Sequence, residues 1–395
     1  MSAEPRPGIE DRRAALLPPE LLPLFDDGFV RSCELIEEYA ARLALDIFRD
    51  CGLEAAYAQE SSVEEAIGRA SLLPAVARVP VAWLCATLAA RGWLARTAGA
   101  NGESRYRLAQ PLPRLDRAEI LAAQTAHDPR CLPSYHIVAL AAEHYPAVLG
   151  GAERGEQALF GPEGISAWVR YFSNANPLYA ISNAVGAIAA EHALPAGPAT
   201  ILEVGGGMGS GAEALLDRLA CAGRSGDISA YQFTEISPLF LKRAQRTLVA
   251  RYPHCSFTFG TLDLDRPLAA TGIVPGGCSL VYGVNVLHVA RDLAATLFEL
   301  RQALRKGGAL VMAECVRPFP GVPVHLELTF NLLGAFRDAT LVPAWRPNGG
   351  FLTPEQWSAA LQANGFHEVR VYPDIAAIRD TFPGFLVAAI VGTRG

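Results

Sequence analysis

A glycine-rich segment near the middle of the chain has the residue types of a nucleoside-binding turn. Residues 201–211 read ILEVGGGMGSG, and the apolar run at their start predicts a buried strand that leads into the turn. Glycines are needed there because any Cβ would block a ligand approaching the backbone, and the following helix offers free N–H groups at its N-terminus. We therefore expect Gly205, Gly207 and Gly209 to line a cofactor site.

The residues around the turn separate two classes of adenine cofactor. In a dinucleotide-binding GxGxxG motif, the glycine after Gly205 and Gly207 would stand at position 210, which is Ser210. Glu203 is an acid in an apolar strand, a costly placement that is explained if it accepts hydrogen bonds from a ligand's amino group. S-adenosylmethionine (SAM) has such a cationic amino group, so we predict SAM as the cofactor.

Two further acids follow the next two predicted strands. Glu235 ends the segment AYQFTEIS, where a carboxylate can accept both ribose hydroxyls, and Asp263 follows SFTFGTL, where it can accept the adenine amino group. Ligands bind outside the carboxyl ends of parallel strands, so acids at three successive strand ends favour one site over three solvated strand ends.

The elements that must position these residues alternate regularly after residue 199. Short apolar runs are separated by helical segments, which is typical of a mainly parallel sheet wrapped by helices. We predict a Rossmann-like, doubly wound α/β domain over residues 197–395. Its expected strands are TILEVGG, AYQFTEIS, SFTFGTL, CSLVYGVN, GALVMAE, FHEVRVYP and FLVAAIV.

The N-terminal part of the chain predicts a mainly helical domain over residues 1–115. Residues 29–53 form one long amphipathic pattern, Ser61 and Ser62 precede acids as in a helix N-cap, and a further helix closes at Gly92. A hairpin around the polar turn GANGES follows, which gives the helix, helix, hairpin order of a winged-helix domain. Residues 116–196 are predicted as a helical connector or lid.

Charge argues against nucleic acid as a partner of this winged-helix-like domain. The chain carries a net charge of −6, and the six arginines between residues 61 and 108 are accompanied by three acids, so no dense basic stripe is expected. A DNA-binding regulator that has lost catalysis remains an alternative. We favour a dimerising or substrate-enclosing domain.

Consecutive motifs over residues 150 to 392 resemble the class I SAM-dependent methyltransferases. LEVGGGMG is similar to their glycine motif, FTEIS to their ribose-binding acid, and LRKGGALVMAE to the turn before their fifth strand. Within that class, FGPEGISAWVRYFSNANPLYAISN, LDLDRP and VNVLHVARDL resemble the C-methyltransferase domains of polyketide synthases, whose pathways make natural products. Leu264, Asn285 and Tyr171, which lie in these motifs, complete the predicted SAM site.

The resemblance also implies a catalytic pair. Polyketide-synthase C-methyltransferase domains use a His-Glu pair to remove a proton from carbon. The two residues of that pair match His288 of NVLH and Glu314 of LVMAE in this sequence. The fourth and fifth strands would lie about 5 Å apart in a parallel sheet, which brings both residues to the cofactor edge. Glu314 could orient the imidazole and stabilise its cationic form.

The acceptor atom stays open at this point. A winged-helix-like domain and the segment GGFLTPEQWSAALQANGF are similar to small-molecule O-methyltransferases, which use a histidine at the position of His288 as base on a hydroxyl. We favour methylation of a carbon next to a carbonyl in a small-molecule or carrier-tethered keto or acyl substrate. O-methylation is the alternative, and a homodimer is possible.

Aromatic residues on both sides of the glycine motif are candidates for the substrate pocket. Tyr179, close after Tyr171, is expected to help close the site, and residues 324–338 are expected to form a substrate-side helix with Phe330 and Phe336 as its apolar wall. A metal held by His288, Glu314 and His325 is conceivable, but no compact ligand motif is present, so we predict none.

The remaining features predict a cytoplasmic protein. The eight cysteines are scattered without CxxC pairs, as expected of reduced, buried thiols. The charged, proline-containing N-terminus lacks the apolar core of a secretory signal, and no stretch approaches the roughly 20 apolar residues of a membrane span.

Overall fold

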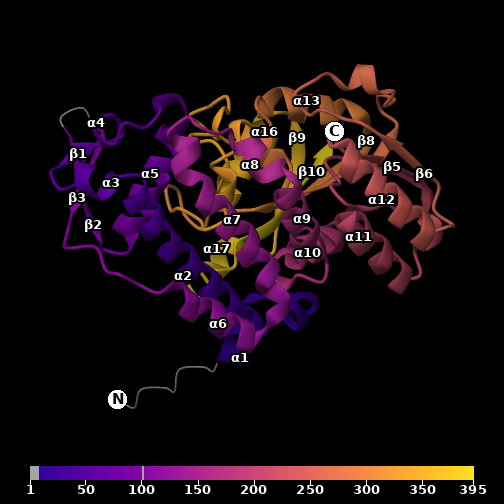
Figure 1. The fold of residues 1–395 in the computed structure, drawn as a ribbon. Helices are drawn as coiled ribbons and strands as arrows, with labels where there is room; N and C mark the ends of the chain where they lie inside the picture. The colour runs from indigo at the N-terminus through magenta and orange to yellow at the C-terminus, as the bar shows by residue number, and fades with distance from the viewer. Residues whose placement is uncertain (1–8, 100–101) are drawn as a thin grey trace, which may run out of the picture. The chain divides into compact units, whose positions relative to one another are not determined.

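The computed structural model describes residues 9–99 and 102–395, which form two compact units (Figure 1). The first unit contains the described residues before 31 together with Tyr179–Pro320 and Thr340–Gly395. The second contains Arg31–Leu178 and Gly321–Ala339. The division into functional domains at 1–115, 116–196 and 197–395 stays a prediction beside these units.

A seven-stranded sheet forms the centre of the first unit (Figure 1). Its order is β6-β5-β4-β7-β8-β10-β9, and every neighbouring pair is parallel except the two that involve β10. The order reverses between β4 and β7, so a ligand crevice is expected outside their carboxyl ends. The strands are β4 (Ala199–Glu203), β5 (Ile228–Thr234), β6 (Phe257–Gly260), β7 (Cys278–Val284), β8 (Leu304–Cys315), β9 (Phe366–Tyr372) and β10 (Val387–Arg394).

The predicted strands and the Rossmann-like fold class are confirmed. β7 is buried along its whole length, as expected of a parallel strand covered on both faces. Helices α12, α13 and α16 pack on β6, on β7 with β8, and on β9 with β10. The helices of this unit are α1 (Ile9–Leu16), η1 (Pro19–Leu24), α10 (Pro177–Ala193), α11 (Ser210–Cys221), η3 (Ser225–Asp227), α12 (Pro238–Arg251), η4 (Leu268–Thr271), η5 (Leu287–Val289), α13 (Leu293–Ala303), α16 (Pro354–Ala363) and α17 (Ile375–Ile378).

The second unit is mainly helical, with one small sheet of order β1-β3-β2. The predicted long helix, short capped helix, third helix and hairpin are all present, while residues 100 and 101 of the predicted turn lie outside the described residues. Its elements are α2 (Asp27–Asp50), α3 (Leu53–Ala56), β1 (Ser61–Ser62), α4 (Val63–Arg69), α5 (Pro74–Ala90), β2 (Leu94–Ala98), β3 (Ser104–Leu108), α6 (Arg117–His127), η2 (Pro129–Cys131), α7 (Leu132–Leu149), α8 (Gly155–Phe160), α9 (Pro162–Tyr171), α14 (Glu327–Phe330) and α15 (Gly334–Arg337).

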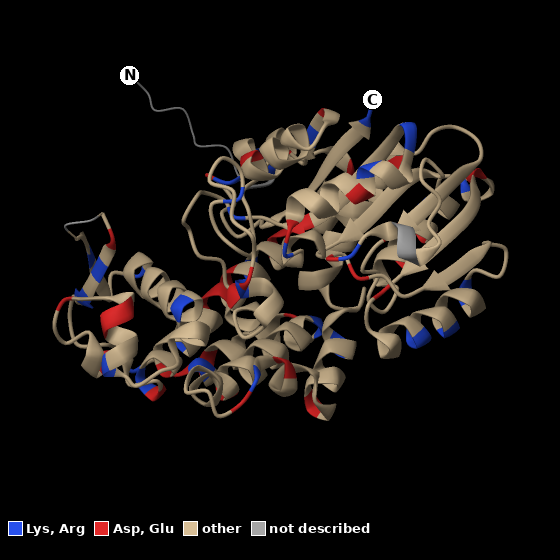
Figure 2. Ribbon diagram, turned by 90° about the horizontal axis from the view of Figure 1, so that it is seen from above, with Lys and Arg blue, Asp and Glu red and all other residues tan. Residues whose placement is uncertain are grey.

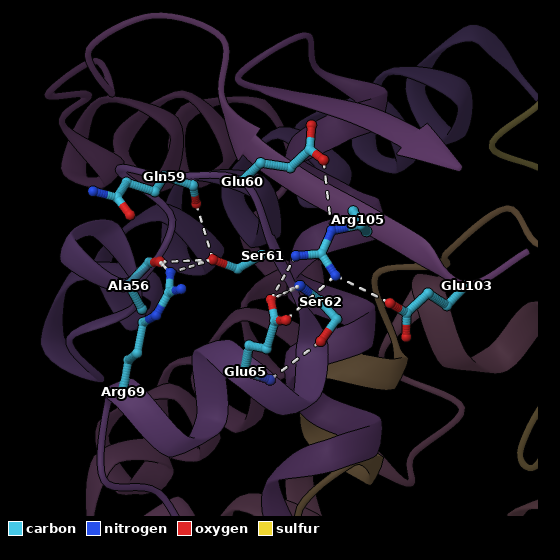
Figure 3. Close-up of polar contacts among 9 residues, drawn as sticks. All are labelled: Ala56, Gln59, Glu60, Ser61, Ser62, Glu65, Arg69, Glu103 and Arg105. Atoms are coloured by element: carbon cyan, nitrogen blue, oxygen red, sulfur yellow. Dashed lines mark hydrogen bonds and ion pairs between the residues drawn. The ribbon is translucent and has the colours of Figure 1, made fainter. Parts of the chain in front are cut away.

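Polar contacts join the start of α4 to the hairpin (Figure 3). Ser62 and Glu65 form a reciprocal capping box, with N···O distances of 2.9 and 3.2 Å. Arg105 of β3 lies among three carboxylates, with contacts of 2.7 Å to Glu65, 3.0 Å to Glu103 and 3.5 Å to Glu60 (Figure 3). The charge of this arginine is therefore balanced within the protein and is not presented as part of a basic surface.

Acidic and basic residues are interspersed over the helices of the second unit (Figure 2). Such a distribution lacks the dense basic stripe that phosphate binding requires. Over the described helices of this unit, the charges give no support to a DNA-binding regulator.

The predicted substrate-side helix over residues 324–338 is wrong. The chain forms two short helices instead, α14 and α15, and Leu333 between them is extended. Two hydrogen bonds explain the break: Gly334 N donates to Glu156 Oε1 at 2.8 Å, and Arg337 Nη1 donates to Asn331 O at 2.8 Å. These contacts replace the backbone bonds that a continuous helix would need.

The cysteines and the hydropathy of the helices add two observations. None of the eight cysteines, all of which lie in the described part of the chain, forms a disulfide, and most are buried. Over the described residues, no single helix has the length and apolar character of a membrane span, although the bent pair α4 and α5 passes by length and composition alone.

Candidate active site

The glycine turn joins β4 to α11 with three left-handed backbone positions. The φ angles are +60° at Gly205, +57° at Gly207 and +92° at Gly209, a region that favours glycine. A Cβ on Gly205 would lie 2.2 Å from Val286 Cγ2, so this glycine allows the turn after β7 to approach. A Cβ on Gly207 would meet no protein atom within 4 Å, which leaves open space on that side of the turn.

Glu203, at the end of β4, is a buried carboxylate. Its exposed fraction is 1%, and Tyr231 Oη donates to its Oε2 at 2.8 Å. Burial raises the pKa of Glu203 to about 8, the Tyr231 hydrogen bond opposes the rise, and the charge of Glu235 adds to it. No described lysine, arginine or histidine pairs with Glu203, so a cationic ligand group would complete the site.

Glu235 directly follows β5 and is held by backbone donors. Gly207 N donates to its Oε2 at 2.9 Å, and Ser237 N donates to its Oε1 at 2.8 Å. Burial raises the pKa of Glu235, while these N–H groups counteract the rise. The backbone N–H of Ile236 also donates to this carboxylate. A carboxylate oxygen can accept more than one hydrogen bond, so Glu235 can still take hydroxyl donors.

Three other predicted cofactor residues make local contacts. Asp263, after β6, accepts from Asp265 N at 3.0 Å and pairs with Arg266 at 3.2 Å. Leu264 is half-buried against the core of this unit. Asn285, after β7, has a φ of +50°, and its Oδ1 accepts from Cys315 N at 2.8 Å. These contacts explain the three residues structurally, and their part in cofactor binding stays a prediction.

His288 and Glu314 form a buried pair at the carboxyl ends of β7 and β8. The imidazole Nδ1 lies 2.7 Å from Glu314 Oε2, and the two side chains are 1% and 0% exposed. Glu314 Oε1 accepts from the backbone N–H groups of Val286 and Leu287 at 3.1 and 2.7 Å. These three hydrogen bonds fix the Glu314 carboxylate, which in turn holds Nδ1 of His288. Nε2 is therefore the ring nitrogen that can act as a base.

The predicted aromatic residues fall into both units. Tyr179, at the start of α10 in the first unit, is buried, which raises its pKa, and it hydrogen-bonds Ser210 of α11. In the second unit, ring centroids lie 5.9 Å apart for Phe330 and Trp168, 5.7 Å for Phe330 and Phe336, and 5.5 Å for Tyr171 and Trp168. The structure thus gathers Tyr171, Phe330 and Phe336 in one aromatic cluster.

The metal alternative gains no support from the part of the chain that the structure describes. No group of three histidine, cysteine, aspartate or glutamate side chains there could hold a metal ion. His325 belongs to the second unit, where burial lowers its pKa to about 4.

Three residues near the site were not found from the sequence. Ile236, next to Glu235, is 57% exposed, which is unusual for an apolar residue at a strand end. Phe351 places its ring 4.7 Å from the imidazole of His288, and the fully buried Arg346 donates to the carbonyl of His288 at 3.3 Å. Phe351 and Arg346 lie about 60 residues beyond His288, and no spacing pattern marks them.

Comparison with known proteins agrees with this architecture. The family model described as a methyltransferase domain matches residues 202–310, which include the glycine turn and both His288 and Glu235. The chain therefore contains a SAM-dependent methyltransferase domain with the class I fold. Relatives of this methyltransferase include polyketide synthase ThaQ of Burkholderia thailandensis, 32% identical over 58% of this chain, and non-reducing polyketide synthase dpmpA of Macrophomina phaseolina, 27% identical over 75%.

The methyltransferase spans only a small part of these relatives, 11% of ThaQ and 13% of dpmpA. Its fold is shared along nearly its whole length with two solved structures. The CurJ carbon methyltransferase has a TM-score of 0.76, with 20% identity over 98% of this chain and 99% of that one. The citrinin polyketide synthase CMeT domain has a TM-score of 0.70, with 19% identity over 97% and 93%.

The residues at the strand ends of this methyltransferase fit SAM as its cofactor. The uncompensated carboxylate of Glu203 suits a cationic amino group, and the open side of Gly207 leaves room beside the backbone. Glu235 presents two oxygens that can accept hydroxyl groups.

The pKa of Glu203 gives a pH-dependent stability. Folding raises this pKa from 4.5 to about 8, so between these values the SAM-free native protein holds a proton that the unfolded chain releases. The free energy of unfolding then falls as pH rises, by about 1.4 kcal/mol per pH unit from this group. Glu203→Gln removes the titration, so its stability advantage over the wild type should grow with pH in that window.

Urea unfolding of both proteins at several pH values across the window measures this difference. Glu163→Gln, at an exposed position of α9, is the control and should show no such trend. A difference between Glu203→Gln and wild type that is the same at every pH would contradict the assignment.

Proposed function

We propose that this methyltransferase methylates a carbon atom made acidic by an adjacent carbonyl group, with His288 as the general base. The observation that carries the proposal is the buried pair of His288 and Glu314, 2.7 Å apart at the cofactor edge of the sheet. A carboxylate on Nδ1 raises the ability of Nε2 to accept a proton and stabilises the imidazolium that results. An acceptor carbon must lose a proton before it can be methylated. It therefore needs such a base more than an acceptor atom that is already a good nucleophile.

The acceptor is proposed to be a polyketide-type keto or acyl compound, either free or tethered to a carrier. The relatives are named as polyketide synthases, and the solved proteins of similar fold are named as carbon methyltransferases. These names support carbon over a hydroxyl oxygen as the acceptor atom. The winged-helix-like part of the chain is proposed to help enclose the substrate or to form a homodimer.

The proposed cofactor contacts follow from the strand-end residues. Glu203 would bind the amino group of SAM, Glu235 the ribose hydroxyls, and Asp263 with Leu264 the adenine. Gly205, Gly207, Gly209 and Asn285 would shape the turn beside it, and Ile236 offers an apolar surface next to the ribose site. Tyr171, Tyr179, Phe330 and Phe336 are proposed to line the cofactor and acceptor side.

The residues of the chain have distinct tasks in the reaction. SAM, when bound, supplies an electrophilic methyl group and departs as S-adenosylhomocysteine. His288 Nε2 accepts the proton of the acceptor carbon, and the electron pair of that C–H bond is delocalised onto the neighbouring carbonyl. Glu203 and Glu235 would hold SAM so that its methyl group is available to this carbon. Glu314 holds the imidazole ring through its Nδ1, while the buried surroundings exclude water.

Substitution of His288 or Glu314 tests the base. We expect His288→Ala to lower kcat by on the order of 10²- to 10⁴-fold. Glu314→Gln should cause a smaller loss, because the imidazole is retained and only the carboxylate beside it is removed. SAM binding should persist in His288→Ala. The assay uses [methyl-13C]SAM and the 3-oxobutanoyl thioester of N-acetylcysteamine, with carbon NMR to locate the new methyl group.

His254→Ala is the matched control, because it removes an exposed histidine of the same unit. Unchanged turnover in His288→Ala would remove the base assignment. A methyl signal on oxygen rather than on carbon would establish the O-methyltransferase alternative.

Substitution of Glu235 tests the cofactor site. Glu235→Ala removes the acceptors for both ribose hydroxyls, and hydrogen bonds to a charged group contribute about 1.5–3 kcal/mol each, so SAM affinity should fall at least tenfold. Isothermal titration calorimetry measures this change. Asp374→Ala is the control, because Asp374 also accepts from a backbone N–H, on α17; equal affinity in Glu235→Ala and the control would reject the assignment.

A further inference from the structure

The turn that carries His288 is held by buried charges of opposite sign at its two ends. At its start, Glu314 Oε1 accepts from Val286 N and Leu287 N. At its end, Arg346 donates to two carbonyls, from Nη2 to His288 O and from Nη1 to Arg291 O, both at 3.3 Å. An anion thus binds the N–H groups of the turn, and a cation binds its C=O groups.

Arg346 is an unusual residue to find in this position. Its exposed fraction is 0%, and its Nε is buried without a hydrogen-bond partner. Burial lowers the pKa of Arg346, and the charges of Asp292 and Asp265 only partly counteract it. Burying a guanidinium is unfavourable because the charge loses its hydration, and an apolar side chain could hold the segment without that penalty. A methionine or leucine could not donate the two hydrogen bonds to main-chain carbonyls that Arg346 donates.

The segment that contains Arg346 contacts the turn at further points. Thr340 N donates to Arg291 O at 2.8 Å, and the Phe351 ring lies 4.7 Å from the imidazole of His288 at an interplanar angle of 43°. Arg317 Nε fixes this part of the segment by donating to Phe351 O at 2.8 Å. Residues 340–351 therefore contact both the main chain and the ring of the turn.

We propose that Arg346 is a positioning residue that fixes the main chain of the His288 turn and so aims Nε2 at the acceptor proton. The inference rests on the proposed base function of His288 and deepens it. Glu314 binds Nδ1 and the N–H groups at the start of the turn, and it leaves the carbonyl end of the turn the freedom to move. The two carbonyl contacts of Arg346 and the ring of Phe351 remove that freedom, and catalytic groups tolerate only small displacements from their productive geometry.

Arg346→Met and Arg346→Lys test this function. Methionine keeps the length and loses both carbonyl contacts, so kcat in the thioester assay should fall on the order of 10- to 100-fold, with the KM for SAM nearly unchanged. Lysine can donate to one of the carbonyls, and we expect it to restore part of the activity. Hydrogen exchange of peptides covering residues 283–291 should be faster in Arg346→Met.

Arg224→Met is the matched control. Arg224 also donates to main-chain carbonyls, those of Glu191, Leu194 and Pro195, and it belongs to the same unit without contacting the His288 turn. It should lose stability without a loss of kcat in the folded protein. If Arg346→Met does not fold, the comparison of Arg346→Lys with Arg224→Met decides.

The His288→Ala/Arg346→Met double variant separates the two proposals. If Arg346 acts through His288, the second substitution should lower kcat little below that of His288→Ala alone. Equal, additive losses in both backgrounds, or a kcat loss no larger than that of Arg224→Met, would overturn the positioning function. Full activity of His288→Ala would instead reject the proposed base, whatever Arg346 does.

Discussion

The arrangement of the active site depends on the hydrogen bonds of the buried Glu314 carboxylate. A carboxylate with 0% exposure is stable only if its lone pairs are occupied, and here two backbone N–H groups and one imidazole nitrogen occupy them. These bonds attach the turn after β7 to the end of β8. Asn285 strengthens the same connection, because its N–H donates to Ala313 O at 2.7 Å and its Oδ1 accepts from Cys315 N.

Buried carboxyl groups also line the neighbouring cofactor edge. Glu203 and Glu235 are both buried and have a raised pKa, and neither pairs with a cationic side chain among the described residues. Such a site is unfavourable without ligand and favourable when a cationic amino group and hydroxyl donors enter. The protein thus places carboxyl groups where a cationic nucleoside would bind them, and the glycine turn supplies the space beside them.

The fold could be predicted from the sequence because its signals are local. Apolar runs such as that of β7 and the glycines at 205, 207 and 209 report burial and left-handed backbone directly, and strand ends then place Glu203, Glu235, His288 and Glu314 on one edge. The rest depends on contacts between distant segments. The break between α14 and α15 is caused by Glu156, nearly 180 residues earlier, and Arg346 finds its carbonyl partners only in the folded chain.

The most direct measurement of the central claim is proton removal without methyl transfer. The 3-oxobutanoyl thioester of N-acetylcysteamine is incubated in D₂O with the enzyme and S-adenosylhomocysteine, which has no methyl group to donate, and deuterium at the carbon between the two carbonyls is followed by mass spectrometry. We expect wild-type enzyme to accelerate this exchange and His288→Ala not to accelerate it. Equal exchange rates with wild type and His288→Ala would contradict it.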